Sequence, residues 1–246
     1  MLLKGKALHH KVQKDALLNA LDTFDSAIKA DEKNGQAYAW KACALGQGLF
    51  RGYIEEDFNV VWKQAEDNLK KARELNENDF EVHRLMSEVT LAMKDFRAAQ
   101  RHSKLAYDMV PNDPRVLSVY GDVCVRTGKV DEGVDALKLA LDLDPIPQGK
   151  TNADPRHAGL LFAYYMSRDK DGCLEQIGHL DEIDVRSWLI TTKICSDEEH
   201  DYENLDWFNE GKKLFADKDW EKVVPDFRLN NDSASEALIE FGKGLF

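Results

Sequence analysis

The sequence predicts an all-α protein built from tandem pairs of helices, and the main reason is a repeat of 34 residues. Three residues of one repeat return 34 positions later in the next, where Ala99, Ala106 and Pro111 are followed by Gly133, Ala140 and Pro145. A fixed period of this size, with small residues at set places, is typical of helical repeat arrays. The chain also has only 6 prolines and 15 glycines among its 246 residues, which favours helix.

The recurring small residues have a packing role. Ala99 and Ala106 stand seven residues apart, so a helix places them on one face, two turns from each other. Small side chains at these places allow a neighbouring helix to come close. Pro111 then ends the second helix of the repeat, because proline lacks the backbone N–H and clashes with the preceding turn.

We expect residues 1–218 to form one array of about five to six helix pairs, wound as a right-handed superhelix. Its clearest repeats are residues 80–111 and 114–145. Residues 219–246 add apolar side chains and a last helical pattern. We expect this segment to be a helical cap that covers the last apolar face of the array.

Residues 46–58 interrupt the period. The interval from Ala27 to Ala72 exceeds one repeat by eleven residues, and the excess lies in this stretch. Insertions in repeat arrays often form loops on the functional side, so its aromatic side chains are candidate partner contacts: Phe50, Tyr53 and Phe58. The alternative is a longer first helix, followed by a loop that covers its own apolar residues.

Charge and composition argue against several classes of protein. The 33 basic and 45 acidic residues give a net charge of −12, which disfavours nucleic-acid binding. No apolar run approaches the ~20 residues of a membrane-spanning helix, and the first ten residues lack the apolar core of a secretory signal. We therefore expect a cytoplasmic protein whose four widely spaced cysteines are reduced packing residues.

The sequence carries no complete motif for catalysis or metal binding. Gly149-Lys150-Thr151 resembles the end of a phosphate-binding loop, but Asp144 stands where that motif needs a glycine. His9 and His10 are adjacent, so a helix points them about 100° apart and they cannot share a metal ion. We expect no catalytic residue, no cofactor and no metal site, and therefore no enzyme.

Residues 114–145 resemble the repeat unit of the tetratricopeptide repeat (TPR) family. The small residue at the eighth position, the glycine between the helices and the alanine near the end are present as Gly121, Gly128 and Ala140. The unit departs from the family pattern with Gly133 where alanine is usual and Leu117 where an aromatic residue is common. The resemblance implies a concave groove lined by the first helix of each pair.

On this register, six side chains of two adjacent repeats face the groove: Arg84, Glu88, Arg115, Ser118, Asp122 and Arg126. The arginines would hold an acidic peptide through charge-assisted hydrogen bonds. Alternatively, they pair locally with Glu81, Glu88 and Asp122. The sequence favours neither of these two alternatives over the other.

The resemblance implies a non-catalytic module for protein–protein interaction, which binds a peptide or a partner domain and can form a homodimer. A narrower resemblance is to the TPR arrays that follow the catalytic domain of bacterial class III adenylate/guanylate cyclases. It rests on segments such as Gln36-Ala-Tyr-Ala-Trp-Lys-Ala and Phe227-Arg-Leu-Asn-Asn-Asp. It implies a regulatory or dimerising region whose catalytic domain lies upstream of Met1. A third alternative is a ligand sensor or enzyme that uses the insertion together with Tyr164 and Tyr165.

Overall fold

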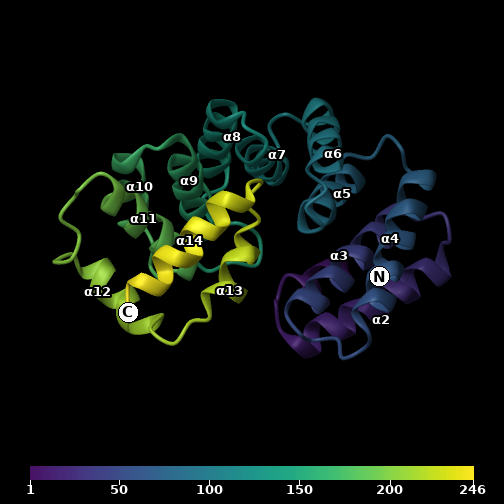
Figure 1. The fold of residues 1–246 in the computed structure, drawn as a ribbon. Coiled ribbons are helices and arrows are strands. Elements are labelled where there is room, and N and C mark those ends of the chain that lie inside the picture. Colours follow the sequence, from purple (N-terminus) through teal and green to yellow (C-terminus); the bar gives the residue numbers. More distant parts are fainter. The chain divides into compact units, whose positions relative to one another are not determined.

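The chain folds entirely into helices and connecting loops. The computed structural model describes residues 1–246 and contains fourteen α-helices and one short 3-10 helix, η1 (Figure 1). The predicted all-α fold is therefore confirmed.

The chain divides into two compact units, which we call unit 1 (Met1–Pro111) and unit 2 (Asn112–Phe246). The boundary lies directly after Pro111, the residue expected to end the first of the two clear repeats. Residues 219–246, the expected helical cap, belong to unit 2.

Unit 1 holds six helices that pack as three consecutive pairs. Their bounds are α1 Leu2–His9, α2 Lys14–Ala30, α3 Gly35–Phe50, α4 Phe58–Leu75, α5 Phe80–Ala92 and α6 Phe96–Met109. The two helices of each pair lie against each other, and α3 also contacts α5. We call the first helix of each pair (α1, α3 and α5) a leading helix.

Small residues allow the helices of unit 1 to pack closely. Ala99 and Ala106 on α6 are fully buried, as the repeat pattern predicts, and Ala65 and Ala72 stand in the same spacing on α4 and are also buried. Larger side chains such as Phe24 fill the interior between them. Burial of a side chain of that size contributes about 1.5–3 kcal/mol to stability.

Most helices begin at an Asp or Asn whose side chain accepts a hydrogen bond from the first turn. In unit 1 these N-cap residues are Asn34, Asp57, Asp79 and Asp95. In unit 2 they are Asp113, Asp169, Asp184 and Asn231. Each such cap is worth about 1 kcal/mol relative to alanine, because it satisfies backbone N–H groups that the helix leaves unpaired.

The extra residues of the 46–58 stretch both lengthen a helix and form a loop. The leading helix α3 has 16 residues, whereas α5 has 13. The chain then turns through residues 51–57 before α4 begins at Phe58. The Tyr53 hydroxyl donates to the Val12 carbonyl at 3.3 Å, which ties this loop to the connection between α1 and α2.

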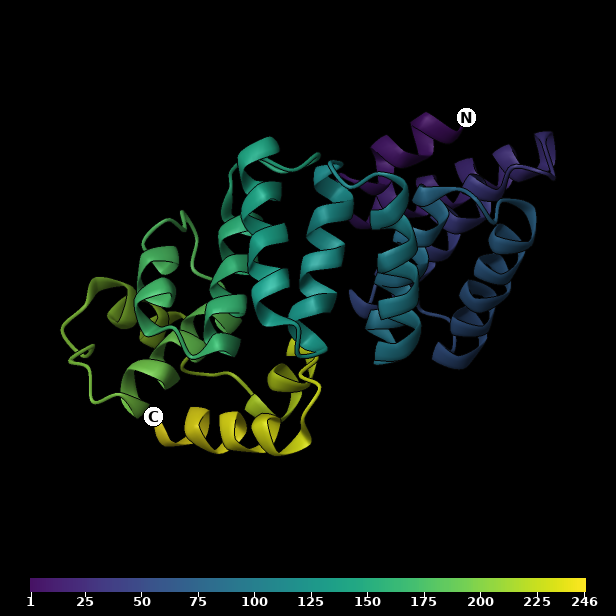
Figure 2. The same cartoon turned by 90° about the horizontal axis from the view of Figure 1, so that it is seen from above.

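Unit 2 also contains three helix pairs, followed by shorter elements and a final helix. Their bounds are α7 Pro114–Arg126, α8 Val130–Leu143, α9 Asp154–Ser167, α10 Lys170–Ile177, α11 Val185–Asp197, α12 Asp206–Leu214, α13 Trp220–Val223, η1 Val224–Phe227 and α14 Asp232–Gly244. The leading helices here are α7, α9 and α11. The last helix, α14, lies against α11, α13 and η1 (Figures 1 and 2).

The core of unit 2 centres on Trp188 of α11, which is completely buried. Its indole ring stacks on Phe208 and on Trp220, with ring centroids 5.8 and 6.2 Å apart, and its Nε1–H donates to the Phe208 carbonyl at 3.1 Å. Trp220 also stacks on the C-terminal residue Phe246. Residues after α12 therefore share one apolar core with the last helix pair.

Gly121 and Gly133 mark the closest approach of α7 and α8. A Cβ atom on Gly133 would lie 2.8 Å from the Gly121 carbonyl oxygen and 2.5 Å from Val125 Cγ2. A Cβ atom on Gly121 would lie 2.9 Å from the Gly133 carbonyl oxygen. The departure from alanine at position 133 thus has a physical reason, since the two backbones touch there.

None of the fourteen α-helices combines the length and the apolar composition that crossing a bilayer requires.

Candidate partner-binding surface

The six side chains predicted to line one groove belong to two units. Arg84 and Glu88 lie on α5 in unit 1, and the other four lie on α7 in unit 2. All six are on leading helices, as the register predicts.

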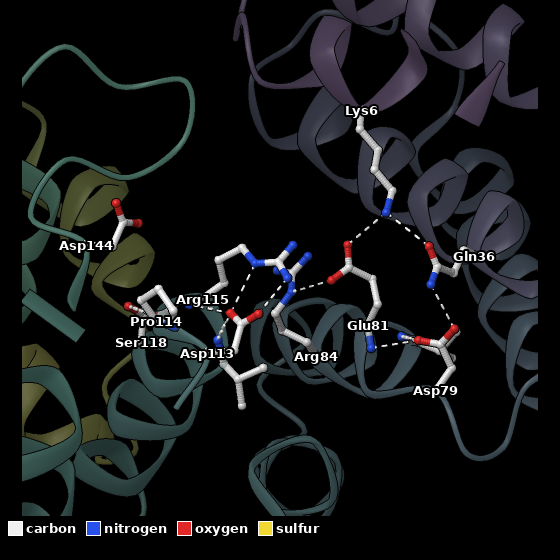
Figure 3. A network of polar contacts seen from close by, with 12 residues as sticks. Lys6, Gln36, Asp79, Glu81, Arg84, Asp113, Pro114, Arg115, Ser118 and Asp144 are labelled. Carbon is white, nitrogen blue, oxygen red and sulfur yellow. Dashed lines mark hydrogen bonds and ion pairs between the residues drawn. The ribbon is translucent and has the colours of Figure 1, made fainter. Parts of the chain in front are cut away.

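In unit 1, the side chain of Glu81 is the centre of a buried polar network. Glu81 is only 2% exposed, and a buried carboxylate is costly unless donors surround it. Its Oε1 accepts from Lys6 Nζ at 3.0 Å, and its Oε2 accepts from Arg84 Nε at 3.4 Å (Figure 3). Its Oε1 also accepts from Trp40 Nε1 at 3.2 Å. These donors come from α1, α3 and α5, so one carboxylate joins all three leading helices.

The network continues toward the start of α5. Lys6 Nζ also donates to Gln36 Oε1 at 3.0 Å, and Gln36 Nε2 donates to Asp79 Oδ2 at 2.8 Å (Figure 3). Asp79 in turn caps α5 by accepting from the backbone N–H of Glu81 at 2.8 Å. The orientation of the leading helices in unit 1 is therefore fixed by polar contacts as well as by packing.

Arg84 is buried and is paired along its own helix. Besides its bond to Glu81, its Nη1 donates to Glu88 Oε1 at 2.7 Å, and its guanidinium lies 5.5 Å from the centroid of the Trp40 ring. Burial alone would lower the pKa of Arg84, but the carboxylates of Glu88 and Glu81 outweigh this effect and hold the pKa above its ordinary value. Arg84 is therefore a buried cation whose charge is balanced by the carboxylates of Glu81 and Glu88.

In unit 2, Arg126 links α7 to the C-terminal segment. Its Nε lies 3.0 Å from both carboxylate oxygens of Asp122. Its Nη1 donates to the carbonyl oxygens of Phe227 at 2.5 Å and Arg228 at 2.7 Å. The guanidinium also stacks on Phe162 of α9, 4.5 Å from the ring centroid. One side chain thus connects two leading helices and the loop after η1.

Arg115 and Ser118 lie nearer the start of α7. Arg115 holds Asp113, the cap of α7, through Nε at 3.1 Å and Nη2 at 2.7 Å. Burial would raise the pKa of Asp113, but the hydrogen bonds from Arg115 prevail and lower it. The Ser118 hydroxyl donates to the Pro114 carbonyl at 2.9 Å and accepts from Arg156 of α9.

Sequence reasoning missed Arg156. It is buried, and its Nε and Nη2 donate to the carbonyl and the carboxylate of Asp144, each at 3.0 Å. This pair joins the start of α9 to the end of α8. Nothing in the sequence distinguishes Arg156 from an exposed arginine, because its partner stands twelve positions earlier, directly after another helix.

All three arginines pair locally, and two of them do so with the carboxylates that the sequence suggested, whereas Arg115 pairs with Asp113. Arg84 pairs with Glu81 and Glu88, and Arg126 pairs with Asp122. Three charged side chains of these local pairs remain partly accessible. The exposed side-chain fraction is 38% for Glu88, 33% for Asp122 and 38% for Arg115.

Two of the three predicted insertion residues form an exposed aromatic cluster. Phe50 and Phe58 are each about half exposed, and their rings flank Trp62 with centroids 6.1 and 5.8 Å from the indole. We call Phe50, Phe58 and Trp62 the aromatic cluster. Tyr53 lies apart from it, because it is half-buried and bonded to Val12.

The cysteines have the properties of packing residues. All four are free thiols. Cys43 Sγ lies 3.5 Å from His9 Nε2, a geometry that invites comparison with a nucleophile and its base. However, burial raises the pKa of Cys43 and lowers the pKa of His9 to about 4. Both groups are therefore neutral near pH 7, and the thiol is not activated.

The sequence matches no protein-family model and no curated protein. Solved structures are nevertheless similar in fold. A structure of PilF from Pseudomonas aeruginosa covers 87% of this chain and 95% of its own, with a TM-score of 0.59 and 14% identity. TTC0263, described as a TPR protein of Thermus thermophilus, covers 87% of this chain and 97% of its own, with a TM-score of 0.54 and 19% identity. At these identities the likeness concerns the fold, and the chain has the helical-repeat fold of TPR proteins.

Proposed function

We propose that this protein is a non-catalytic protein–protein interaction module that contacts a peptide or a partner domain through its leading helices. The supporting observations are the charged side chain of Glu88 on α5 in unit 1 and those of Arg115 and Asp122 on α7 in unit 2. Each presents an accessible charge on a leading helix, and each is held by an ion pair within its own unit. Accessible charged side chains on a helix surface are suited to selecting a partner by electrostatic complementarity.

These charges are ordered before any partner arrives. Arg84 holds Glu88 and Arg126 holds Asp122, in both cases from a buried position. A flexible side chain that is immobilised on binding costs about 0.5–1.5 kcal/mol. Residues that are already fixed avoid most of this cost. In this proposal Arg84, Ser118 and Arg126 are positioning residues, and Glu88, Arg115 and Asp122 are the contacts.

The aromatic cluster is a second contact surface in this proposal. Its half-exposed rings lie on unit 1, at the junction of α3 and α4. Exposed aromatic side chains contribute much of the binding energy in protein interfaces, because they bury a large area at a small cost in entropy. The cluster would supply affinity, and the charged contacts would supply specificity.

The narrower resemblance to cyclase arrays stays a prediction from the sequence, and no contact in the structure favours it. The cytoplasmic location likewise stays a prediction from the sequence.

Affinity capture from a cell extract, followed by mass spectrometry, tests the proposal. The bait is compared with a variant that carries Glu88→Gln, Arg115→Gln and Asp122→Asn. A matched control carries the same chemical changes at exposed positions of the second helices: Glu74→Gln, Arg97→Gln and Asp142→Asn. We expect the first variant to lose partners that the control retains. Equal capture by both would contradict contact through the leading helices.

A loss of partners by Phe50→Ser and Phe58→Ser alone would instead assign recognition to the aromatic cluster. Light scattering of the purified chain separates a second copy of the protein from a different partner.

A further inference from the structure

The aromatic cluster of unit 1 is an apolar patch that reaches the surface. Phe50 is 49% exposed and Phe58 is 51% exposed, and the ring of Trp62, which both flank, is half-buried. The three side chains come from two helices that pack against each other, since Phe50 ends α3 and the other two lie in the first turns of α4 (Figure 1). Apolar side chains that gather in one exposed place are typical of contact surfaces.

The three rings present two nearly perpendicular planes. The Phe58 ring is parallel to the Trp62 indole within 5°, whereas the Phe50 ring stands at 78° to it. The face of an aromatic ring carries partial negative charge and attracts cations, among which the planar guanidinium of arginine is the most frequent partner in proteins. The geometry of the cluster is therefore suited to a cation as well as to an apolar group.

The chain itself pairs guanidinium groups with aromatic rings elsewhere. Arg84 lies 5.5 Å from the centroid of the Trp40 ring, and Arg126 lies 4.5 Å from that of Phe162. No cation of the chain lies over the ring of Phe58 or of Trp62. These two rings remain available to a cation from another molecule.

A carboxylate stands next to these rings. Phe58, Trp62 and Glu66 follow one another at intervals of four residues on α4, so they lie on one helix face with Cβ atoms of successive members about 5–6 Å apart. The side chain of Glu66 is half-buried and takes part in no ion pair. Its charge is therefore open to a cation that lies on the Trp62 ring.

The other charges around the cluster are mostly matched within the chain. Lys14 bonds Glu55 at 3.1 Å, and Lys63 bonds Asp67 at 2.6 Å. The hydrogen bond to Asp67 is the main reason that the pKa of Lys63 is raised, and Glu66 has a smaller effect. Lys63 is therefore assigned to Asp67, and its charge leaves that of Glu66 largely unmatched.

Negative charge remains after these two pairs are set aside. Residues 51–67 together with Lys14 hold five carboxylates and three cations, which is an excess of two negative charges. Outside the pairs, Arg51 faces three carboxylates: Glu56, Asp57 and Glu66. Asp57 is engaged as the cap of α4. Glu56 is exposed and, like Glu66, takes part in no ion pair.

We propose that the aromatic cluster binds an arginine side chain of a basic partner segment. The guanidinium lies on the rings of Phe58 and Trp62 and donates to the Glu66 carboxylate, while Glu56 attracts a second basic residue of the segment. Arginine suits this site because its planar group stacks on an aromatic face and presents paired N–H donors to a carboxylate. This inference rests on the proposed function and assigns a chemical class of partner to its second contact surface.

Fluorescence anisotropy with labelled synthetic peptides tests the inference on the full-length protein. Each ten-residue peptide carries two arginines at a separation of one to five residues, in an otherwise Gly/Ser background. Matched sets carry lysine, or the uncharged isostere citrulline, at the same positions. The salt concentration is about 150 mM, at which charges farther apart than about 8 Å are screened. We expect arginine peptides to bind, lysine peptides to bind about threefold more weakly, and citrulline peptides about tenfold more weakly or not at all.

Two variants remove the two parts of the site separately. Phe58→Leu removes a ring and keeps an apolar side chain, and Glu66→Gln removes the carboxylate charge. The controls are Val60→Ala, an exposed apolar position on another face of α4, and Glu32→Gln, an exposed position before α3. Each of the first two variants should weaken binding of the arginine peptides about fivefold, and the controls should leave it unchanged. Circular dichroism confirms that all four variants remain helical.

The indole N–H signal of Trp62 in a nitrogen–proton NMR spectrum gives a second readout. The variant Trp62→Phe assigns this signal among those of the five tryptophans. We expect the arginine peptides to shift the Trp62 signal more than the other four. Shifts confined to the other tryptophans would place the peptide elsewhere and overturn the inference.

Failure of this inference is distinct from failure of the proposed function. The inference is wrong if no arginine peptide binds, if citrulline peptides bind equally well, or if Glu66→Gln and Glu32→Gln weaken binding to the same extent. The proposed function would still stand if the bait retained partners that depend on Glu88, Arg115 and Asp122.

Discussion

Arg126 and Phe227 are 101 residues apart in the sequence, yet the Arg126 guanidinium donates to the Phe227 carbonyl oxygen at 2.5 Å. This bond joins a leading helix of unit 2 to the segment that follows the helix pairs. The backbone carbonyl, and not a side chain, is the acceptor. The contact therefore depends on the position of the loop and not on the identity of its residue.

Replacement of Arg126 should destabilise unit 2. Arg126→Met keeps much of the side-chain volume but leaves two carbonyl groups and Asp122 without their donor. Loss of buried partners of this kind costs about 2–3 kcal/mol of unfolding free energy. The part that comes from Asp122 is small, because its side chain is partly exposed. Urea denaturation followed by circular dichroism measures the change. Lys213→Met, at an exposed position of α12, is the control and should change stability by about 0.5 kcal/mol or less.

Glu81→Gln should destabilise unit 1. The amide has the same shape, but it removes the charge that Lys6 and Arg84 share in a buried position. Removing one member of a buried ion pair costs about 3 kcal/mol. The exposed Glu74→Gln is the matched control, since its pair with Lys71 is long and solvated. If the two variants lowered the free energy of unfolding equally, the network around Glu81 would not join the leading helices.

The stability of the protein should decrease between pH 6.5 and pH 4. His102 Nδ1 lies 3.0 Å from His83 Nδ1, and His83 Nε2 lies 2.7 Å from the Glu77 carbonyl oxygen. His83 Nε2 therefore donates to that carbonyl, and the contact between the two Nδ1 atoms needs one nitrogen with a proton and one without, so the two rings cannot both be protonated. Burial, with help from His83, lowers the pKa of His102 to about 4.

Because the folded pKa of His102 lies below the unfolded value of about 6.5, the unfolded chain binds more protons in this interval, and stability falls as the pH falls through it. His9 acts in the same direction, since burial and His10 lower its pKa to about 4. Urea midpoints at pH 7, 5.5 and 4.5 measure the effect. His102→Gln should reduce the pH dependence; an unchanged slope in this variant would contradict the role of the histidine pair.

Two glycine substitutions should have opposite effects. Gly133→Ala places a Cβ atom 2.8 Å from a carbonyl oxygen of α7, so we expect a loss of about 1–3 kcal/mol although alanine favours helix. Gly46→Ala, inside α3, meets no atom within 4 Å, and should gain about 0.5–1 kcal/mol from helix propensity. Thermal unfolding of both variants gives the sign of each change.

The fold was predictable because it depends on local periodicity. Small residues such as Ala99 and Ala106 recur at the repeat interval and are buried. The pairs Arg84–Glu88 and Arg126–Asp122 were also open to prediction, because residues four apart meet on a helix. Arg156 and Arg228 were not, since their contacts join elements distant in sequence and no local pattern reports them. The hydrogen bonds from Arg126 to the carbonyl oxygens of Phe227 and Arg228 were missed for the same reason.

Site-specific photo-crosslinking in cells tests most directly whether partners contact the leading helices. A photoreactive amino acid is placed at Glu88 or Asp122 on the leading helices, and at Glu74 or Asp142 on the second helices. We predict crosslinked products of defined mass from the first two positions and none from the last two. Products from Glu74 and Asp142 alone, or equal products from all four positions, would contradict partner recognition by the leading helices.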